Sequence, residues 1–218
     1  MAPNVPSTRY ENQRRAAIKA AAAVFSDKGF HGASTKDIAE RLGIKQGSLY
    51  YYFKSKEDAL GEVCLFGLED YVRRMEKIAT SDQPFEAKLM ATITSHLASY
   101  REKNEAFRVY NHERLYLPKN KRTLLKELGS RYRRMLEGIF EEGIRDRLIR
   151  DSIDCHFAAL AIIGICNAWG DHIARDDDLD TFDVIQKIMD LLLNGLSERR
   201  KVDRATGLPT RRETVDDQ

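Results

Sequence analysis

Residues 34–53 read STKDIAERLGIKQGSLYYYF, and this stretch predicts two short helices joined by a tight turn. Ser34 is a suitable N-cap for the first helix, and Asp37, three residues on, completes a short-armed capping box. Gly43 stands at the turn, where a residue without Cβ adopts a left-handed backbone at no steric cost. The second helix carries hydroxyl, amide and aromatic side chains, as expected of a helix in the DNA major groove. The stretch therefore predicts a helix-turn-helix that reads DNA.

Outside this motif, apolar residues recur at helical spacing and no segment has the alternation of a strand. The predicted fold is all-α, with an N-terminal three-helix DNA-binding head and a C-terminal helical body. Further helices are expected over residues 9–27, 56–79, 85–102, 105–115, 119–146, 152–174 and 181–196. The predicted domains are a flexible arm (1–8), the helix-turn-helix domain (9–54), a helical body (55–200) and a disordered tail (201–218).

The composition predicts a soluble cytoplasmic protein without a membrane span. Residues 1–60 carry ten Lys and Arg against six Asp and Glu, while the remainder carries 26 against 28. The surplus of positive charge in the head favours contact with phosphate. The three cysteines have no close spacing, which argues against a disulfide framework. The densest apolar stretch, residues 157–169, is too short to cross a bilayer, and the polar, basic N-terminus does not resemble a signal peptide.

Motifs for enzyme chemistry are missing from the sequence. The run that begins at His112 has Tyr116 where a zinc-binding helix would place its second histidine. A glycine-rich phosphate loop and a nucleophile elbow are also absent. We therefore predict a protein that is not an enzyme, with no catalytic residue, no metal site and no cofactor.

The head resembles the TetR family of bacterial transcriptional regulators over residues 10–60. The motifs that carry the resemblance are Ala21–Phe25, Lys28–Phe30, Ser34–Ala39, Gly43–Ile44, Gly47–Phe53 and Ser55–Glu57. The resemblance implies a homodimer that binds a palindromic, double-stranded DNA operator. In this family the last two helices pair with their symmetry mates, and these two are the most apolar helices of the chain.

The resemblance also implies which side chains contact DNA. They are Thr35, Lys36, Lys45, Gln46, Ser48, Tyr50, Tyr51, Tyr52 and Lys56. Lys45, Gln46 and Ser48 occupy the end of the second helix that reaches base edges. Lys56 is expected to contact phosphate. Either Tyr50 or Phe53 is expected to pack inward beside Leu49.

The family places an effector cavity among the body helices, so the resemblance implies that residues 55–200 form an effector-binding and dimerisation domain. The side chains expected to line it are Tyr100, Phe107, Tyr110, Asn111, His112, Tyr132, Met135, Asn167 and Trp169. Residues 107–118, 131–144 and 190–196 are similar to members that sense acyl-CoA thioesters, although residues 170–172 depart from that pattern. The predicted function is a repressor released by a small apolar or amphipathic effector, with an acyl-CoA thioester as one possibility. The alternative is an effector-independent DNA-binding protein, either an activator or a nucleoid-associated factor.

Overall fold

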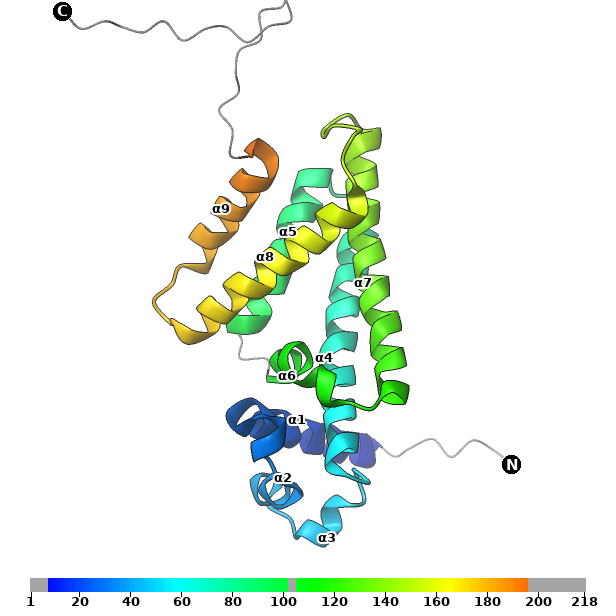
Figure 1. The fold of residues 1–218 in the computed structure, drawn as a ribbon, viewed down its shortest axis with the longest axis vertical. Coiled ribbons are helices and arrows are strands. Elements are labelled where there is room, and N and C mark those ends of the chain that lie inside the picture. The colour runs from blue at the N-terminus through cyan, green and yellow to red at the C-terminus, as the bar shows by residue number, and fades with distance from the viewer. Residues whose placement is uncertain (1–7, 102–104, 196–218) are drawn as a thin grey trace, which may run out of the picture. The chain divides into compact units, whose positions relative to one another are not determined.

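The computed structural model describes residues 8–101 and 105–195 (Figure 1). The predicted tail, and residues 1–7 of the predicted arm, lie outside the described residues. Within the described ranges every element is helical, which confirms the all-α prediction. The elements are α1 (Thr8–Gly32), α2 (Thr35–Leu42), α3 (Gln46–Leu49), α4 (Lys56–Ala79), α5 (Phe85–Arg101), α6 (Glu105–Glu113), a 3-10 turn η1 (Arg114–Tyr116), α7 (Lys119–Arg145), α8 (Cys155–Arg175) and α9 (Thr181–Asn194).

The chain divides into two compact units, the first ending at Thr181. In the first unit, α1, α2 and α3 form the head, and α4 runs from the head into the body, where it packs against α5, α6 and α7 (Figure 1). Helix α8 packs against α5 and α7. The second unit contains α9, whose apolar side chains Val184, Ile185, Ile188 and Met189 share one helical face.

Helix α4 joins head and body because its apolar side chains follow the helical period over its whole length. Ser55 is its N-cap and accepts a hydrogen bond from the Asp58 N–H at 3.1 Å. Leu60, Val63 and Cys64 are completely buried, and Met75, near the other end, is also buried. A single helix therefore connects the core of the head to the core of the body.

Helix α1 extends beyond its predicted end at Asp27. The backbone at Gly29 is non-helical (φ 68°, ψ 169°), and a further helical turn follows as far as Gly32. The N–H of Phe30, which begins this turn, donates to Glu113 Oε2 at 3.1 Å. A carboxylate from α6 thus takes the place of a local N-cap, a partner that lies too far away in sequence to be predicted.

The candidate DNA-binding head and effector groove

The helix-turn-helix has the capping geometry that the sequence predicts. The Asp37 N–H donates to Ser34 Oγ at 3.2 Å, and the Ser34 N–H donates to Asp37 Oδ2 at 2.8 Å. Gly43 ends α2 in the left-handed region at φ 72°. Lys28 Nζ donates to Asp37 Oδ1 at 2.6 Å, and this bond, together with those from Ser34, lowers the pKa of Asp37 to about 2. The charged carboxylate therefore fixes the start of α2 against the end of α1.

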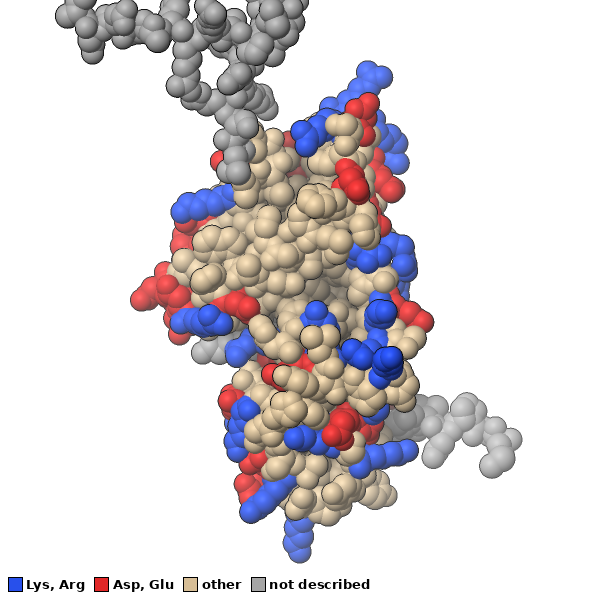
Figure 2. Space-filling model, viewed as in Figure 1, with Lys and Arg blue, Asp and Glu red and all other residues tan. Residues whose placement is uncertain are grey.

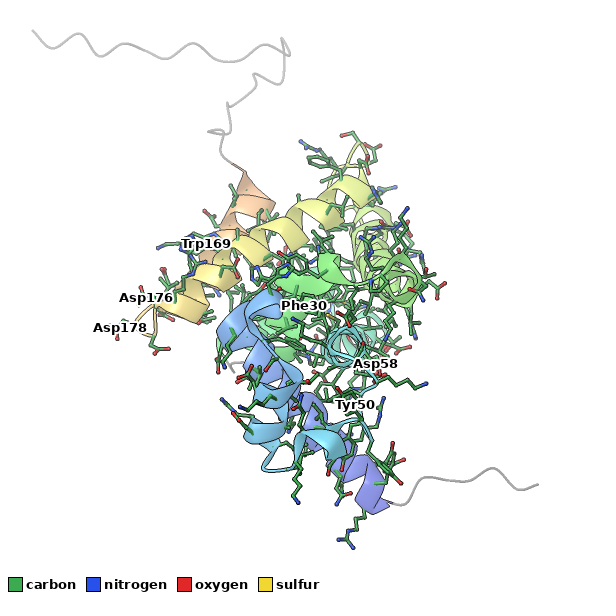
Figure 3. All side chains as sticks on the ribbon, turned by 60° about the horizontal axis from the view of Figure 1, so that its bottom comes forward. Phe30, Tyr50, Asp58, Trp169, Asp176 and Asp178 are labelled. Atoms are coloured by element: carbon green, nitrogen blue, oxygen red, sulfur yellow. The ribbon has the colours of Figure 1, made fainter. Side chains whose placement is uncertain are left out.

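The segment after the turn is a shorter helix than predicted. Regular α-helix covers only Gln46–Leu49, and hydrogen-bonded turns carry the chain on to Phe53. Leu49 and Phe53 are both buried, so Phe53 is the inward neighbour of Leu49, while Tyr50 is 56% exposed. Tyr51 is 82% exposed and Tyr52 is half-buried. Tyr50, which Figure 3 labels, and Tyr51 therefore lie on the outer surface of the head, whereas Tyr52 is only partly accessible.

The remaining predicted DNA contacts surround the start of α3. Gln46 Nε2 donates to Thr35 Oγ1 at 2.9 Å, which ties the side chain that follows the turn to the first residue of α2. Lys45 and Ser48 are exposed, and Lys36 is exposed with its ammonium 3.8 Å from Glu40. The Gln46–Thr35 bond thus joins the starts of α2 and α3, and Lys36, Lys45 and Ser48 are exposed on these same two helices or at their starts.

Lys56 has a structural role that the sequence did not indicate. Its ammonium donates to the carbonyl oxygens of Phe30 at 2.8 Å and Ala33 at 3.0 Å. It also lies 4.4 Å from the centroid of the Phe30 ring. Two of its three N–H donors therefore hold the end of α1 to the start of α4, and one remains for the predicted phosphate contact.

Two further contacts connect the head to body helices. Lys121, in the first turn of α7, forms an ion pair with Asp58 in the first turn of α4. The hydrogen bonds from Lys121 and from the Lys54 N–H lower the pKa of Asp58, although burial opposes them. On the α6 side, the Phe30 ring stacks on Tyr116 with centroids 5.6 Å apart. Phe30 of the head and Asp58 of the connecting helix α4, both labelled in Figure 3, therefore contact η1 and α7 of the body.

Inside the body, five of the predicted effector residues form a closed aromatic and polar cluster. Tyr100, Phe107 and Tyr132 are buried, and Asn111 and Asn167 are half-buried. Asn111 Nδ2 donates to the Tyr100 hydroxyl at 2.7 Å, which itself donates to Asn167 Oδ1 at 3.2 Å. The residues predicted for a cavity thus satisfy one another in this structure.

Sequence reasoning missed His96, which lies in this cluster. Its Nε2 is 2.9 Å from Asn167 Oδ1, and its Nδ1 is 3.4 Å from the Tyr132 hydroxyl. Because Asn167 Oδ1 can only accept, Nε2 carries the proton and Nδ1 is left to accept from Tyr132. Burial lowers the pKa of His96 to about 4. The available signal was its spacing, since His96 continues the apolar face of α5 formed by Leu89 and Ile93.

Tyr71 of α4 is buried and contributes a polar atom to the cluster. Its ring stacks on Phe107 with centroids 3.9 Å apart. Its hydroxyl is buried and has no hydrogen-bond partner among the residues that the structure describes. An unpaired buried hydroxyl costs about 1–3 kcal/mol, so the cluster contains an unsatisfied polar group.

A groove of about 740 Å³ opens beside this cluster, between α6, η1, α7 and α8. Its apolar wall is formed by Leu115, Leu125, Leu160 and Ile163, and its basic side chains are Arg114, Lys119, Arg122, Lys126 and Arg133. We call it the basic groove. Lys119, Arg122 and Lys126 form no ion pair with any described residue. In Figure 2, lysine and arginine side chains gather along the half of α7 that is nearer the head.

The other predicted effector residues are dispersed. Tyr110 lines the basic groove, and Met135 is half-buried on α7. His112 is exposed and pairs with Asp171, with His112 Nε2 and Asp171 Oδ1 3.1 Å apart. Trp169 is 39% exposed on α8 beside His172 (Figure 3). One of the nine predicted residues therefore contributes to the basic groove.

Helix α8 exposes much of its apolar surface. Phe157 is 71% exposed and Leu160 47%, and Gly164 and Ala168 continue the same face at spacings of three or four residues. We call these four residues the α8 stripe. Among the helices in the described ranges, α8 alone is long and apolar enough to cross a membrane. Core helices of soluble proteins can have the same length and composition.

Comparison with known proteins identifies families and relatives to which this chain is similar. Residues 17–63 match the family model described as "Bacterial regulatory proteins, tetR family", and residues 82–196 match the one described as "Tetracyclin repressor-like, C-terminal domain". The transcriptional repressor KstR2 of Rhodococcus jostii strain RHA1 is 31% identical over 147 residues, which are 67% of this chain and 72% of the relative. The fatty acid metabolism regulator protein of Bacillus subtilis strain 168 is 25% identical over 186 residues, 84% of this chain and 94% of the relative.

A solved structure extends the likeness to the body. FadR from Bacillus subtilis in complex with stearoyl-CoA matches with a TM-score of 0.73 and 25% identity, over 84% of this chain and 99% of that one. The two family models together span most of the predicted head and most of the body. The chain belongs to the TetR family of bacterial transcriptional regulators.

Proposed function

We propose that this protein is a cytoplasmic, homodimeric repressor that binds a palindromic operator and releases it when an acyl-CoA thioester occupies the basic groove. The head, residues 9–54, binds DNA, and residues 55–200 bind the effector and the second subunit. The repressor KstR2 and the fatty acid regulator support this function by analogy. The observation that carries it is the basic groove, which combines apolar walls with unpaired cations close to the head.

DNA is bound by the outer surface of α2, α3 and the following turns. In this proposal Gln46 reads a base edge together with Lys45 and Ser48, and its hydrogen bond to Thr35 supports the role by fixing the side chain. The hydroxyls of Tyr50, Tyr51 and Tyr52, with Lys36 and the remaining donor of Lys56, contact phosphates. Two heads related by a two-fold axis read half-sites about 34–36 Å apart.

The chemistry of the basic groove matches the two parts of an acyl-CoA molecule. Lys119, Arg122 and Lys126 offer donors to the phosphates of the coenzyme, and Leu115, Leu125 and Ile163 offer surface to the acyl chain. A volume of about 740 Å³ lies within the usual range of about 300–1,000 Å³ for ligand pockets. The Tyr71 hydroxyl lies deeper, in the cluster, and a thioester carbonyl that reached it would give this donor its missing acceptor.

Helix α7 couples the effector to the head. Its first turn contributes Lys119 to the groove and Lys121 to the ion pair with Asp58 at the start of α4. A ligand that pulls this turn toward the groove therefore strains the contact that positions the head. A 100-fold loss of operator affinity needs a coupling free energy of only about 2.7 kcal/mol, well within reach of one partly buried ion pair and its neighbours.

The second subunit covers the α8 stripe. An apolar helix face of this length is unfavourable in water, and two copies packed across a two-fold axis bury it. Gly164 and Ala168 allow the two α8 helices to approach closely. Leu160 belongs to both the stripe and the groove, so the partner subunit lies at the rim of the effector site.

Operator binding can be tested with duplexes selected from a random pool by the purified protein. Fluorescence anisotropy then measures affinity for the selected duplex with and without stearoyl-CoA. We expect affinity to fall at least 10-fold at saturating stearoyl-CoA, and we expect Arg122→Ala with Lys126→Ala to require a higher concentration for the same effect. Arg134→Ala, an exposed arginine of α7 outside the groove, is the matched control. Operator affinity that stearoyl-CoA leaves unchanged would remove the proposed effector.

The alternative function is operator binding without an effector. The closed cluster of Tyr100, Asn111 and Asn167 favours it, because those side chains satisfy one another and leave little interior space for an acyl chain. A crystal structure of protein purified from its host distinguishes the two. A retained thioester supports the repressor, and an unchanged cluster together with ligand-insensitive DNA binding supports the alternative.

A further inference from the structure

A second pocket, of about 260 Å³, lies between the head and the body within the first unit. Phe25, Ser26 and Gly29 of α1 form one side, and α6 and the last turn of α8 form the other. We call it the joint pocket. It shares no lining residue with the basic groove. A molecule bound there would contact α1, α6 and α8 at once.

In the joint pocket the acidic side chain has a hydrogen-bond partner, whereas the two arginines have no acidic partner among the described residues. Glu113 already accepts the Phe30 N–H, and His112 is paired with Asp171. Arg108 and Arg175 face the pocket, and neither forms an ion pair with any residue in 8–101 or 105–195. The acidic group is therefore occupied, and the two guanidinium groups are available to an incoming anion.

The remaining lining determines what kind of anion fits. Phe25 and Val109 are almost completely buried and give the pocket an apolar floor, and Ser26 adds a hydroxyl. The volume of the joint pocket lies below the range of about 300–1,000 Å³ that is usual for pockets of drug-sized ligands, so its ligand is smaller than a drug-sized molecule. We propose that the joint pocket binds a small organic anion through its carboxylate or phosphate group, held by Arg108 and Arg175.

The position of the pocket gives such an anion a defined effect. The ligand would bridge α1 to α6 and α8, next to the Gly29 kink where Glu113 binds the Phe30 N–H. It would favour the head orientation seen here over others, in proportion to its differential affinity for the two. This effect on DNA rests on the proposed function, whereas binding of the anion does not.

The test is thermal unfolding of the full chain in the presence of three probes: inorganic phosphate, glycerol 3-phosphate and succinate. Above the dissociation constant, each tenfold rise in probe concentration raises Tm by about 3–5 °C for a two-state domain of this size. We expect such a rise with at least one probe, and we expect Arg108→Ala and Arg175→Ala to abolish it. Arg145→Ala, which removes an arginine from the last turn of α7 outside the pocket, is expected to keep it.

Glu113→Gln gives an independent readout that a merely structural role would not produce. The glutamine oxygen can still accept the Phe30 N–H, while the repulsion between Glu113 and the anion disappears, so the variant binds the probe more tightly than the parent. A response to the phosphate probes alone identifies a phosphate ligand, and a response to succinate identifies a carboxylate. Absence of any shift, or a shift that survives both arginine substitutions, overturns the proposal. Operator DNA is not used, so failure here is separate from failure of the repressor function.

Discussion

Gly67→Ala is the substitution that best tests how α4 and α6 are joined. A Cβ atom built on Gly67 lies 2.7 Å from both the carbonyl carbon and the oxygen of Ala106, and 2.9 Å from the Phe107 nitrogen. Ordinary contacts begin at about 3.4 Å, and all three neighbours are backbone atoms. Since no side chain can rotate away, α6 itself must move by several tenths of an ångström.

The expected energy follows from two opposing contributions. Alanine gains up to about 1 kcal/mol over glycine in a helix interior. Overpacking a well-filled contact costs about 1–3 kcal/mol, and the stacking of Phe107 on Tyr71 is disturbed as well. The net result is a destabilisation of about 1–2 kcal/mol. Gly138→Ala in α7 is the control, because nothing lies within 4 Å of its added Cβ and only the helical gain applies.

The assay is urea and thermal unfolding of the two variants beside the parent protein. We expect Tm of Gly67→Ala to lie about 5–10 °C below that of Gly138→Ala, from about 2–4 °C for each kcal/mol in a chain of this length. Because α6 carries Glu113 to Phe30, the variant is also expected to bind operator DNA with altered affinity. Equal stability of the two variants would refute the close approach of α4 and α6.

Three other predictions concern the cluster, the head and the dimer. Because the folded pKa of His96 is about 4 and the unfolded value is about 6.5, the unfolded state binds more protons between these values. The free energy of unfolding of the parent should therefore fall by up to about 3 kcal/mol as pH falls from 6.5 to 4, and that of His96→Gln should lack this decrease. If the urea midpoints of parent and variant changed in parallel across this range, the prediction would be contradicted. Tyr51→Ala should leave Tm within about 1–2 °C of the parent value, because the side chain is 82% exposed. The same variant should bind operator DNA at least about 10-fold more weakly in fluorescence anisotropy, and unchanged affinity would exclude a contact between Tyr51 and DNA. Phe157→Glu should convert a dimer to a monomer in analytical ultracentrifugation, whereas Leu148→Glu, at an exposed apolar residue outside α8, should not. If both variants remained dimeric, the interface would lie elsewhere.

The local part of the head could be predicted because its determinants are neighbours in sequence. Ser34, Asp37 and Gly43 act within one or two turns of the chain, and the capping box and left-handed turn form where they were expected. The inward position of Leu49 and Phe53 follows from spacing in the same way. The end of α1 was misplaced because the helical turn that follows Gly29 is capped by Glu113, a residue of another helix.

The effector site could be predicted only in part, for a related reason. A polar or aromatic residue in apolar surroundings can face a cavity or satisfy another buried polar group, and the two outcomes leave the same sequence pattern. Tyr100, Asn111 and Asn167 come from different helices and hydrogen-bond directly to one another. His96 joins Asn167 to Tyr132 of a further helix. The cations of the basic groove could not be assigned to a site from the sequence, because periodicity does not tell which neighbouring helix lies opposite.

The sequence by itself determined the helical class, the caps and turn of the helix-turn-helix, and the family resemblance, since each depends on residues close together in the chain. Tertiary structure alone decided which side chains meet: Glu113 with Phe30, Lys121 with Asp58, and the walls of the basic groove and joint pocket. The physical reason is that hydrogen bonds, ion pairs and pockets act over a few ångströms. Residues 83 positions apart, such as Phe30 and Glu113, come within that range only when the packing of whole helices brings them there.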